Sequence, residues 1–256
     1  MTKNTIQSLE RGLKILTILG SSDQPLSLNE IAGHFTIDRS SVFRLISTLL
    51  QNHFVQQDTD TKKYSLGFRL MELAGSFNDQ GKIESIIRPI ISRICAATKQ
   101  NTHLAVLEGA DVVFLAVEQP RESISVNIAV GTREPAVATA LGKAILSFRD
   151  SGILSTLLDS ADLRPYTERS ILSKEALRDE LAMARKERIA YDREEYKSGI
   201  VCIAAPVINY RGEALYSIGI SGPSGLMMPR IDDFARVVRD AGIEASSKYG
   251  YSGGTE

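Results

Sequence analysis

Two arginines and two serines near position 40 have the types and spacing needed for contact with nucleic acid. Residues 38–51 place apolar side chains at helical spacing on one face and short polar or guanidinium groups on the opposite face. A guanidinium donates two parallel hydrogen bonds to guanine O6 and N7, and it also binds phosphate. The polar face carries Arg39, Ser40, Ser41 and Arg44. We expect Ser40, Ser41 and Arg44 to read base edges and Arg39 to hold phosphate.

The elements around this segment predict a helix-turn-helix. Residues 27–35 begin with Ser27 and Glu30 at capping-box spacing and continue as a short amphipathic helix. Only two residues separate it from Asp38, whose carboxylate can cap the next helix. Two short helices on a tight turn, the second with an arginine face, are typical of major-groove binding.

A hairpin follows the second helix. Residues 54–57 and 64–66 are β-prone runs around a polar turn that contains Lys62 and Lys63. Attached to a helix-turn-helix, such a hairpin is a wing, and its lysines can contact phosphate; a solvated hairpin tip is the alternative. With a first helix over 5–20, the sequence predicts a winged helix-turn-helix domain over 5–66.

Residues 67–82 are expected to form a linker, with a helix over 67–77 that ends at 78–81. Its apolar stripe predicts packing on a partner subunit, or on the first helix of the same chain.

Residues 83–250 predict an α+β domain with an antiparallel sheet. The expected helices cover 83–98, 138–148, 151–190 with a break at 164–166, and 230–248. The expected strands cover 102–107, 112–117, 124–130, 200–208 and 214–221, with 131–135 as a turn.

Composition sets limits on the function. The net charge is -1, and residues 1–66 contain seven Lys or Arg against six Asp or Glu, so DNA contact must depend on local placement. The two cysteines, Cys95 and Cys202, lie in apolar surroundings and are expected to be reduced. With no signal-like or membrane-spanning stretch, a soluble cytoplasmic protein is expected.

The sequence offers little catalytic chemistry. It contains none of the motifs CxxC, HExxH, GxSxG or GxxxxGK[ST], and its three histidines are scattered, so neither metal nor cofactor is expected. Cys202 and His103 could in principle form a nucleophile and its base, but nothing in the sequence brings them together.

Several segments, in order, resemble the IclR family of bacterial transcriptional regulators. In the first domain they are Ser-Leu-Asn-Glu-Ile-Ala at 27–32, Arg-Ser-Ser-Val-Phe-Arg-Leu at 39–45 and Tyr-Ser-Leu-Gly at 64–67. In the second they are the runs at 131–135, 138–146, 191–207 and 217–223. The resemblance implies a winged helix-turn-helix, a dimerising linker helix and a GAF-like effector-binding domain.

The resemblance also implies an effector pocket for a small organic acid. The positions that match the family's pocket are Ala140, Leu141, Asp192, Ile200, Cys202, Gly219 and Ser221. Ser125 and Asn127 are further candidates, and backbone N–H groups near Ala140 could receive a carboxylate. Leu141 and Gly219 depart from a small residue and a serine found in some members, so no relative's ligand is transferred. A solvated Asp192 and a purely structural Cys202 are the alternatives.

The sequence therefore predicts a ligand-responsive, sequence-specific DNA-binding regulator, most simply a repressor of a catabolic operon. It is expected to be a homodimer or homotetramer on a palindromic operator. Two rival hypotheses remain open, namely an enzyme acting on a small carboxylate and a winged helix that binds protein. No motif in the sequence identifies the effector or the operator, or shows whether the effector weakens or strengthens DNA binding.

Overall fold

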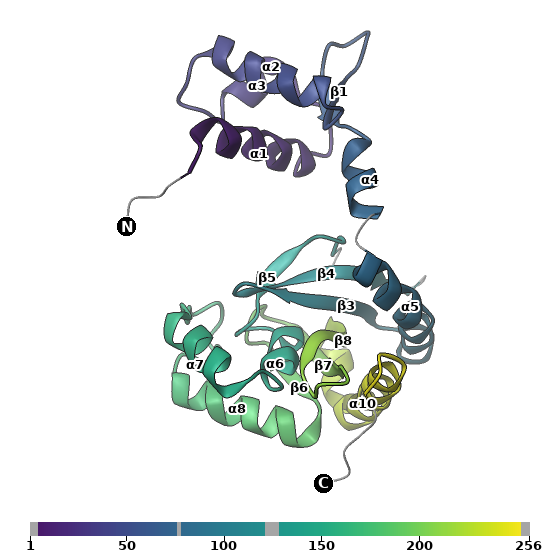
Figure 1. The fold of residues 1–256 in the computed structure, drawn as a ribbon. Coiled ribbons are helices and arrows are strands. Elements are labelled where there is room, and N and C mark those ends of the chain that lie inside the picture. Colours follow the sequence, from purple (N-terminus) through teal and green to yellow (C-terminus); the bar gives the residue numbers. More distant parts are fainter. Residues whose placement is uncertain (1–4, 76–77, 121–127, 252–256) are drawn as a thin grey trace. The chain divides into compact units, whose positions relative to one another are not determined.

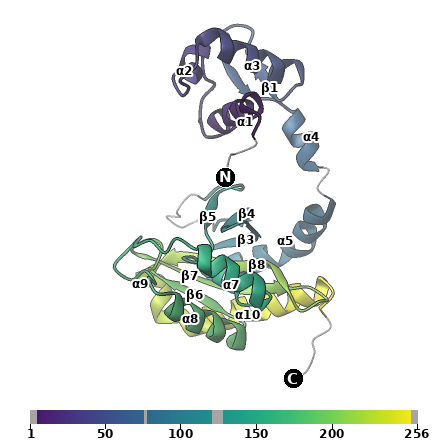
Figure 2. The same ribbon diagram turned by 60° about the vertical axis from the view of Figure 1, so that its left-hand side comes forward.

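The chain divides into two units, Met1–Gly81 and Lys82–Glu256. The structure is a computed structural model that describes residues 5–75, 78–120 and 128–251. Figures 1 and 2 trace the ribbon from two directions. No helix among the described residues is long and apolar enough to cross a membrane.

The first unit is a winged helix-turn-helix. Its elements are α1 (Gln7–Gly20), α2 (Leu28–Ala32), α3 (Arg39–Gln51), β1 (Val55–Gln57) and β2 (Tyr64–Leu66). Ser27 and Glu30 form the predicted capping box at the start of α2. The two strands pair antiparallel as the predicted hairpin. A core centred on Ile15, Ile31 and Ile46 joins the three helices to the hairpin.

The linker differs in part from its prediction. The helix α4 (Arg69–Gly75) lies inside the expected range, and residues 76–77 are outside the described part of the chain. Residues 78–81 were expected to end this helix, but they form the first turn of α5 (Asn78–Thr98). The expectation was wrong because Asn and Asp favour helix starts as well as turns.

The second unit is built on one six-stranded antiparallel sheet. Its strands are β3 (Asn101–Glu108), β4 (Asp111–Glu118), β5 (Arg133–Pro135), β6 (Ala190–Arg193), β7 (Ile200–Ile208) and β8 (Ala214–Pro223). The spatial order is β5-β4-β3-β8-β7-β6, so the hairpins β3–β4 and β7–β8 meet in the middle. The predicted α+β class with an antiparallel sheet is confirmed.

Helices cover both faces of this sheet (Figures 1 and 2). On one face α5 and α10 (Ile231–Lys248) bury a core with Ile203, Ile218 and Ile220. On the other face, α6 (Ala140–Leu146), α7 (Ser151–Ser160) and α8 (Lys174–Glu187) bury a second core. The short helix α9 (Ser224–Met227) and a 3₁₀ turn (Met228–Arg230) lead into α10.

Four predicted elements of this unit need correction or lie partly outside the described residues. The helix expected over 138–148 is the shorter α6, and the helical break expected at 164–166 extends over 161–173. The helix expected to reach residue 190 ends at Glu187, and residues 190–193 form β6, whose burial alternates as in a strand. Residues 133–135 of the expected turn form β5. Most of the strand expected over 124–130 lies outside the described residues, and 128–130 is not a strand.

Candidate functional site

The N-terminus of α3 is organised by Asp38. The Asp38 carboxylate accepts the Ser41 backbone N–H at 2.9 Å and the Ser41 hydroxyl at 2.7 Å. The Ser40 hydroxyl also donates to it, and this bond, together with those from Ser41, holds the pKa of Asp38 well below its usual range. The predicted cap is therefore confirmed. It also engages the hydroxyl protons of both serines that were expected to read bases, so their oxygen atoms remain available mainly as acceptors.

Exposed side chains on α3 supply the surface that could enter a groove. Arg39, Ser40 and Arg44 are exposed, while Ser41 is half-buried. Phe43 is 49% exposed although it is a large apolar residue, and the sequence interpretation overlooked it. Ser40, Phe43 and Arg44 share one face by their spacing of three and four residues. An apolar side chain beside an arginine suits a thymine methyl next to a guanine.

The wing tip is shaped by Asp58. Its carboxylate accepts the backbone N–H groups of Asp60 and Thr61, at 3.1 and 2.7 Å. Lys62 is exposed and has a left-handed backbone with φ of 59°, whereas Lys63 is half-buried. The charge of Lys63 is one cause, after the hydrogen bonds from Ser27, that lowers the pKa of Glu30. Lys62 is thus the freer of the two expected phosphate contacts.

In the second unit, a cross-strand row of side chains brings three predicted effector residues together. Asp192 on β6 pairs with Cys202 on β7, which pairs with Ser221 on β8. Directly paired residues point to the same face of a sheet. Cys202 packs with the core on the α6 side, so this face is the one covered by α6. The row continues to Asn101 on β3.

His103 lies in the neighbouring row on the same face of the sheet and was not assigned to the pocket from the sequence. It lies on β3 opposite Gly219, and its Nε2 is 2.8 Å from the Ser221 hydroxyl oxygen. The ring is 2% exposed, packs edge-on against Phe114, and has no hydrogen-bond partner at Nδ1 among the described residues. Burial lowers the pKa of His103 to about 3, so the imidazole is neutral at physiological pH.

The helix α6 covers this face, and two close approaches fix it there. Ala140 and Leu141 are both buried. A Cβ atom placed on Gly142 would lie 2.1 Å from the Ala136 carbonyl oxygen, so only glycine allows this approach. A Cβ atom placed on Gly219 would lie 3.0 Å from Leu141 Cδ2. Positions 141 and 219, at which this chain differs from some family members, are therefore neighbours. The Leu141 side chain fills the volume that a side chain at position 219 would occupy.

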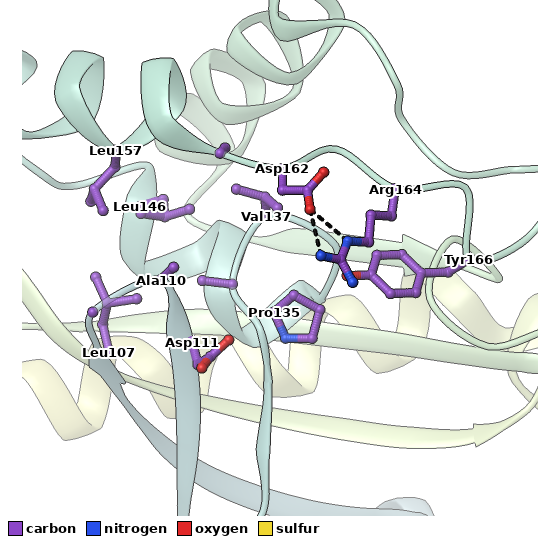
Figure 3. A pocket seen from close by; sticks show the side chains of 13 residues that line it. Leu107, Ala110, Asp111, Pro135, Val137, Leu146, Leu157, Asp162, Arg164 and Tyr166 are labelled. Atoms are coloured by element: carbon purple, nitrogen blue, oxygen red, sulfur yellow. Dashed lines mark hydrogen bonds and ion pairs between the residues drawn. The ribbon is translucent and has the colours of Figure 1, made fainter. Parts of the chain in front are cut away.

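Three expected residues lie at the edge of this cluster or outside the described part of the chain. Ile200 is half-buried and pairs with Pro223 at the end of β7 and β8. Asn127 and Ser125 lie outside the described residues. A cavity of about 340 Å³ between the β3–β4 turn, α6 and α7 is lined by none of the expected effector residues (Figure 3).

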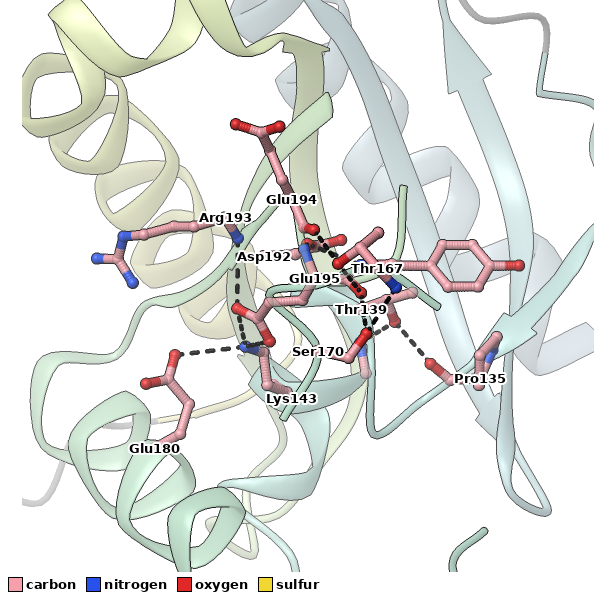
Figure 4. A network of polar contacts seen from close by, with 12 residues as sticks. Pro135, Thr139, Lys143, Thr167, Ser170, Glu180, Asp192, Arg193, Glu194 and Glu195 are labelled. Atoms are coloured by element: carbon pink, nitrogen blue, oxygen red, sulfur yellow. Dashed lines mark hydrogen bonds and ion pairs between the residues drawn. The ribbon is translucent and has the colours of Figure 1, made fainter. Parts of the chain in front are cut away.

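A buried ion pair ties α6 to the turn that follows β6 (Figure 4). Lys143 is fully buried, and its Nζ lies 2.8 and 2.9 Å from the Glu195 carboxylate oxygens and 3.4 Å from Glu180. The Asp192 carboxylate accepts the backbone N–H groups of Glu195 and Tyr196, at 2.7 and 3.3 Å. These contacts hold Asp192 in place beside α6.

Burial controls the protonation of this cluster. Asp192 is 2% exposed, and desolvation raises its pKa to about 7 despite the N–H groups that it accepts. Cys202 is half-buried as a residue, yet desolvation of its thiol and the nearby Asp192 charge raise its pKa well above the ordinary value. A thiol that stays protonated is a poor nucleophile. The arrangement is suited to binding a small polar molecule.

A winged helix-turn-helix on a separate α+β domain with a buried polar cluster is the architecture of a ligand-responsive transcriptional regulator. Two family models match the chain, the IclR helix-turn-helix domain over residues 8–59 and the bacterial transcriptional regulator IclR C-terminal domain over residues 77–247. The chain belongs to the IclR family of bacterial transcriptional regulators and is a DNA-binding regulator of transcription.

Individual relatives align over nearly the whole chain. The regulator XynR of Escherichia coli is 28% identical, covering 96% of this chain and 98% of that protein. The regulator BhcR of Paracoccus denitrificans is 30% identical, covering 96% and 87%. The crystal structure of Thermotoga maritima IclR superposes with a TM-score of 0.79 at 27% identity, covering 96% and 100%. An IclR homologue from Microbacterium hydrocarbonoxydans, crystallised with 4-hydroxybenzoate, shares the fold with a TM-score of 0.83 at 22% identity, covering 94% and 98%.

Proposed function

We propose that this regulator is a cytoplasmic repressor that reads its operator through α3 and releases it on binding a small organic acid. The observation that carries this proposal is that one chain combines an exposed arginine face on α3, in the first unit, with a buried polar cluster covered by α6, in the second unit. The repressors among its relatives support the sign of regulation.

For DNA reading, we assign base contacts to Arg44, Ser40 and Ser41, and phosphate contacts to Arg39, Lys62 and Lys63. Arg44 supports this best because its guanidinium is exposed on the face that it shares with Ser40. The Asp38 cap limits the serines to accepting hydrogen bonds, for instance from a cytosine or adenine amino group.

Replacing Arg44 by alanine tests the reading face. Loss of a bidentate contact to guanine should weaken operator binding by about 1–3 kcal/mol and relax specificity at one base pair. Fluorescence anisotropy with the operator and with single-base variants measures both effects. Arg11→Ala, which removes an arginine that donates to Gln7 within α1, is the matched control. Operator binding by Arg44→Ala that equals that of wild type would support a winged helix that binds protein instead.

For the effector, we assign the site to Ala140, Leu141, Asp192, Ile200, Cys202, Gly219 and Ser221, with Asn127 as a further contact, and we add His103. The cross-strand row of Asp192, Cys202 and Ser221 supports this assignment. The 4-hydroxybenzoate bound to a relative makes aromatic hydroxy acids the first class to screen.

A thermal-shift screen of the full chain against small organic, aromatic and sugar acids tests the effector site. A ligand that binds only the folded state raises the melting temperature. Asp192→Asn and Ser221→Ala should abolish the shift, whereas Ser155→Ala, at an exposed position on α7, should retain it. Turnover of the acid during the assay, monitored by NMR, would instead support the enzyme hypothesis.

We infer further that the regulator acts as a homodimer or homotetramer. Exposed apolar side chains on α4 and its N-terminal approach, Phe68 and Met71, are 72% and 70% exposed and support packing on a second copy. A two-fold assembly would present two α3 helices to a palindromic operator. The effector can then control DNA binding only if it binds with different affinity to the assembly whose DNA-binding domains fit the operator and to the assembly whose domains do not.

A further inference from the structure

The cavity shown in Figure 3 has an apolar end and a polar end. Leu107, Leu146 and Leu157 form the apolar end, where Leu146 is 1% exposed. Arg164, Asp162 and Tyr166 form the polar end, which faces solvent: the side chains of Arg164 and Asp162 are 68% and 67% exposed, and the guanidinium lies beside the Asp162 carboxylate (Figure 3). The volume of about 340 Å³ is at the lower end of the range for small-molecule sites, and it suits a single ring.

The charges around this cavity determine which ligands fit. The Arg164 guanidinium donates to Asp162 at 2.6 Å, and this bond raises the pKa of Arg164. The other carboxylate in the lining, Asp111, is 3.3 Å from the guanidinium of Arg133. That guanidinium also pairs with Glu108 at 2.6 Å, so each carboxylate of the lining has at most one arginine and the lining offers no cation in excess. A carboxylate ligand would have to displace an aspartate, whereas a hydroxyl can accept from an arginine and donate to an aspartate at once.

We propose that this cavity is a second ligand site, separate from the effector site, for an uncharged ring-sized molecule that carries one hydroxyl group. The ring lies among the three leucines, and the hydroxyl reaches the Arg164–Asp162 pair. The class of ligand differs from the organic acid assigned to the α6-covered cluster.

The walls of the cavity are joined directly to the effector cluster. Directly after Tyr166, the Thr167 hydroxyl donates to the carbonyl oxygens of Glu194 and Glu195, at 2.7 and 3.2 Å. The Ser170 hydroxyl donates to the Glu195 carbonyl oxygen at 2.8 Å. The backbone N–H of Glu195 in turn donates to Asp192. A ligand that fixes Arg164 and Tyr166 therefore stabilises the turn that positions Asp192.

Occupancy of the second site should consequently favour binding at the first. This coupling rests on the effector function proposed above, whereas the binding site itself does not. By linkage, the effector should raise affinity for the second ligand by the same factor.

Two fluorinated rings that differ in charge test the site on the full chain. In ¹⁹F NMR titrations, 4-fluorophenol should bind saturably with a Kd of about 1 mM or tighter, and 4-fluorobenzoate should bind this site at least about tenfold more weakly. Leu157→Trp fills the apolar end and should weaken 4-fluorophenol about tenfold or more. Ile153→Trp, 51% exposed one turn earlier on α7, is the matched control and should change nothing. Ala161→Leu, also in the lining, provides a second blocking variant should Leu157→Trp melt at a lower temperature than the control.

The outcomes separate this proposal from the effector assignment. Loss of 4-fluorophenol binding in Leu157→Trp but not in Ser221→Ala supports the second site. Binding that survives both blocking variants, or that Ser221→Ala abolishes, overturns it and leaves the effector site untouched. A 4-fluorobenzoate signal that responds only to Asp192→Asn reports on the effector site and would stand even if the second site failed.

Hydrogen exchange tests the coupling. With 4-fluorophenol bound, amides of residues 192–196 should exchange more slowly, and Thr167→Val should remove this protection while the phenol still binds. Protection that Thr167→Val leaves intact would show that the two sites are not joined through this segment.

Discussion

At the scale of single residues, His103 illustrates how burial decides chemistry. A depressed pKa means that the unfolded chain binds a proton more readily than the native protein does, so His103 contributes stability above its ordinary pKa of 6.5. That contribution is lost as the pH falls from about 6.5 towards 3. We expect one of the chain's three histidine signals, in ¹³C-histidine NMR, to stay neutral down to pH 4. His103→Gln should remove that signal, and a His103 signal that titrates near 6.5 would contradict the burial argument.

Asp192 should influence stability in the opposite direction. Its pKa of about 7 lies above the ordinary 3.8, so the native state holds the proton more tightly and stability falls as the pH rises between these values. Asp192→Asn keeps an oxygen for the two N–H groups but removes the charge. It should raise the free energy of unfolding at pH 8, by a few kcal/mol at most, since a pKa displaced by one pH unit corresponds to about 1.4 kcal/mol.

Urea denaturation at pH 5 and pH 8 measures this difference. The advantage of Asp192→Asn should be smaller at pH 5 than at pH 8, because at pH 5 only part of the interval between 3.8 and about 7 has been crossed. Asp159→Asn, at an exposed position on α7, is the control and should shift stability equally at both pH values. An Asp192→Asn protein that loses stability at pH 8 would show that the charge of Asp192 is compensated by Lys143 more strongly than burial penalises it.

The sequence could predict some of these residues and not others, for physical reasons. The caps of α2 and α3 depend on neighbours within three positions, so Ser27, Glu30 and Asp38 were assignable from spacing. The place of His103 depends on the register between β3 and β8, which are more than a hundred residues apart. No local pattern encodes that register. Asp192, in a run of charged residues, was assigned only through the family resemblance.

At the scale of elements, the contact between α6 and β8 has a complementary pair. The Leu141 side chain fills the volume that a side chain at position 219 would need. A Cβ at position 219 would also approach the Ile203 carbonyl oxygen, at 2.7 Å. We expect Gly219→Ser alone to destabilise the protein by about 1–3 kcal/mol through overpacking. Combined with Leu141→Ala, it should cost less than the sum of the two single changes.

A double-mutant cycle by urea denaturation measures the coupling between these positions. Residues in contact typically show interaction energies of about 0.5–3 kcal/mol. Val137→Ala with Gly219→Ser is the control pair, because Val137 is not among the nearest neighbours of a Cβ at position 219. Strict additivity for Leu141 and Gly219 would mean that the backbone contact with Ile203 alone decides the cost. A coupled pair would account for the presence of leucine at 141 together with glycine at 219 in this chain.

The elements themselves were predictable where one periodicity persists. Long helices such as α5 and α10, and the hairpins β3–β4 and β7–β8, follow clear patterns of burial. Short elements were missed, because three or four residues, as in β5 and β6, are stabilised by their neighbours in the sheet rather than by their own sequence. The cavity beside α7 was likewise invisible, since it is formed by segments that only the fold brings together.

At the scale of the whole molecule, charge is distributed so that DNA binding depends on few contacts. The chain has a net charge of -1, and residues 1–66 have an excess of only one positive charge. Non-specific attraction to DNA is therefore weak. Each lysine or arginine that neutralises one phosphate contributes about 0.9 to the slope of log K against log salt concentration. A DNA-binding domain with few phosphate contacts should show a shallow slope, so the loss of a single contact should change it measurably.

Replacing both wing lysines tests this directly. Lys62→Gln with Lys63→Gln should reduce the salt slope by about 2 for each head that binds, if each lysine holds one phosphate. Because Lys63 is half-buried and lies near Glu30, Lys62 should account for the larger share in the single variants. Affinity should fall by the same factor for the operator and for its single-base variants, since phosphate contacts carry no sequence information.

Operator titrations by anisotropy at several potassium chloride concentrations provide the slopes. Lys186→Gln, at an exposed position on α8 in the second unit, removes the same charge and should leave the slope unchanged. Arg44→Ala should behave differently from both, with a loss of discrimination between base pairs that exceeds its change in slope. A wing variant whose slope equals that of wild type would remove the hairpin from the DNA interface and leave α3 as the binding element of the first unit.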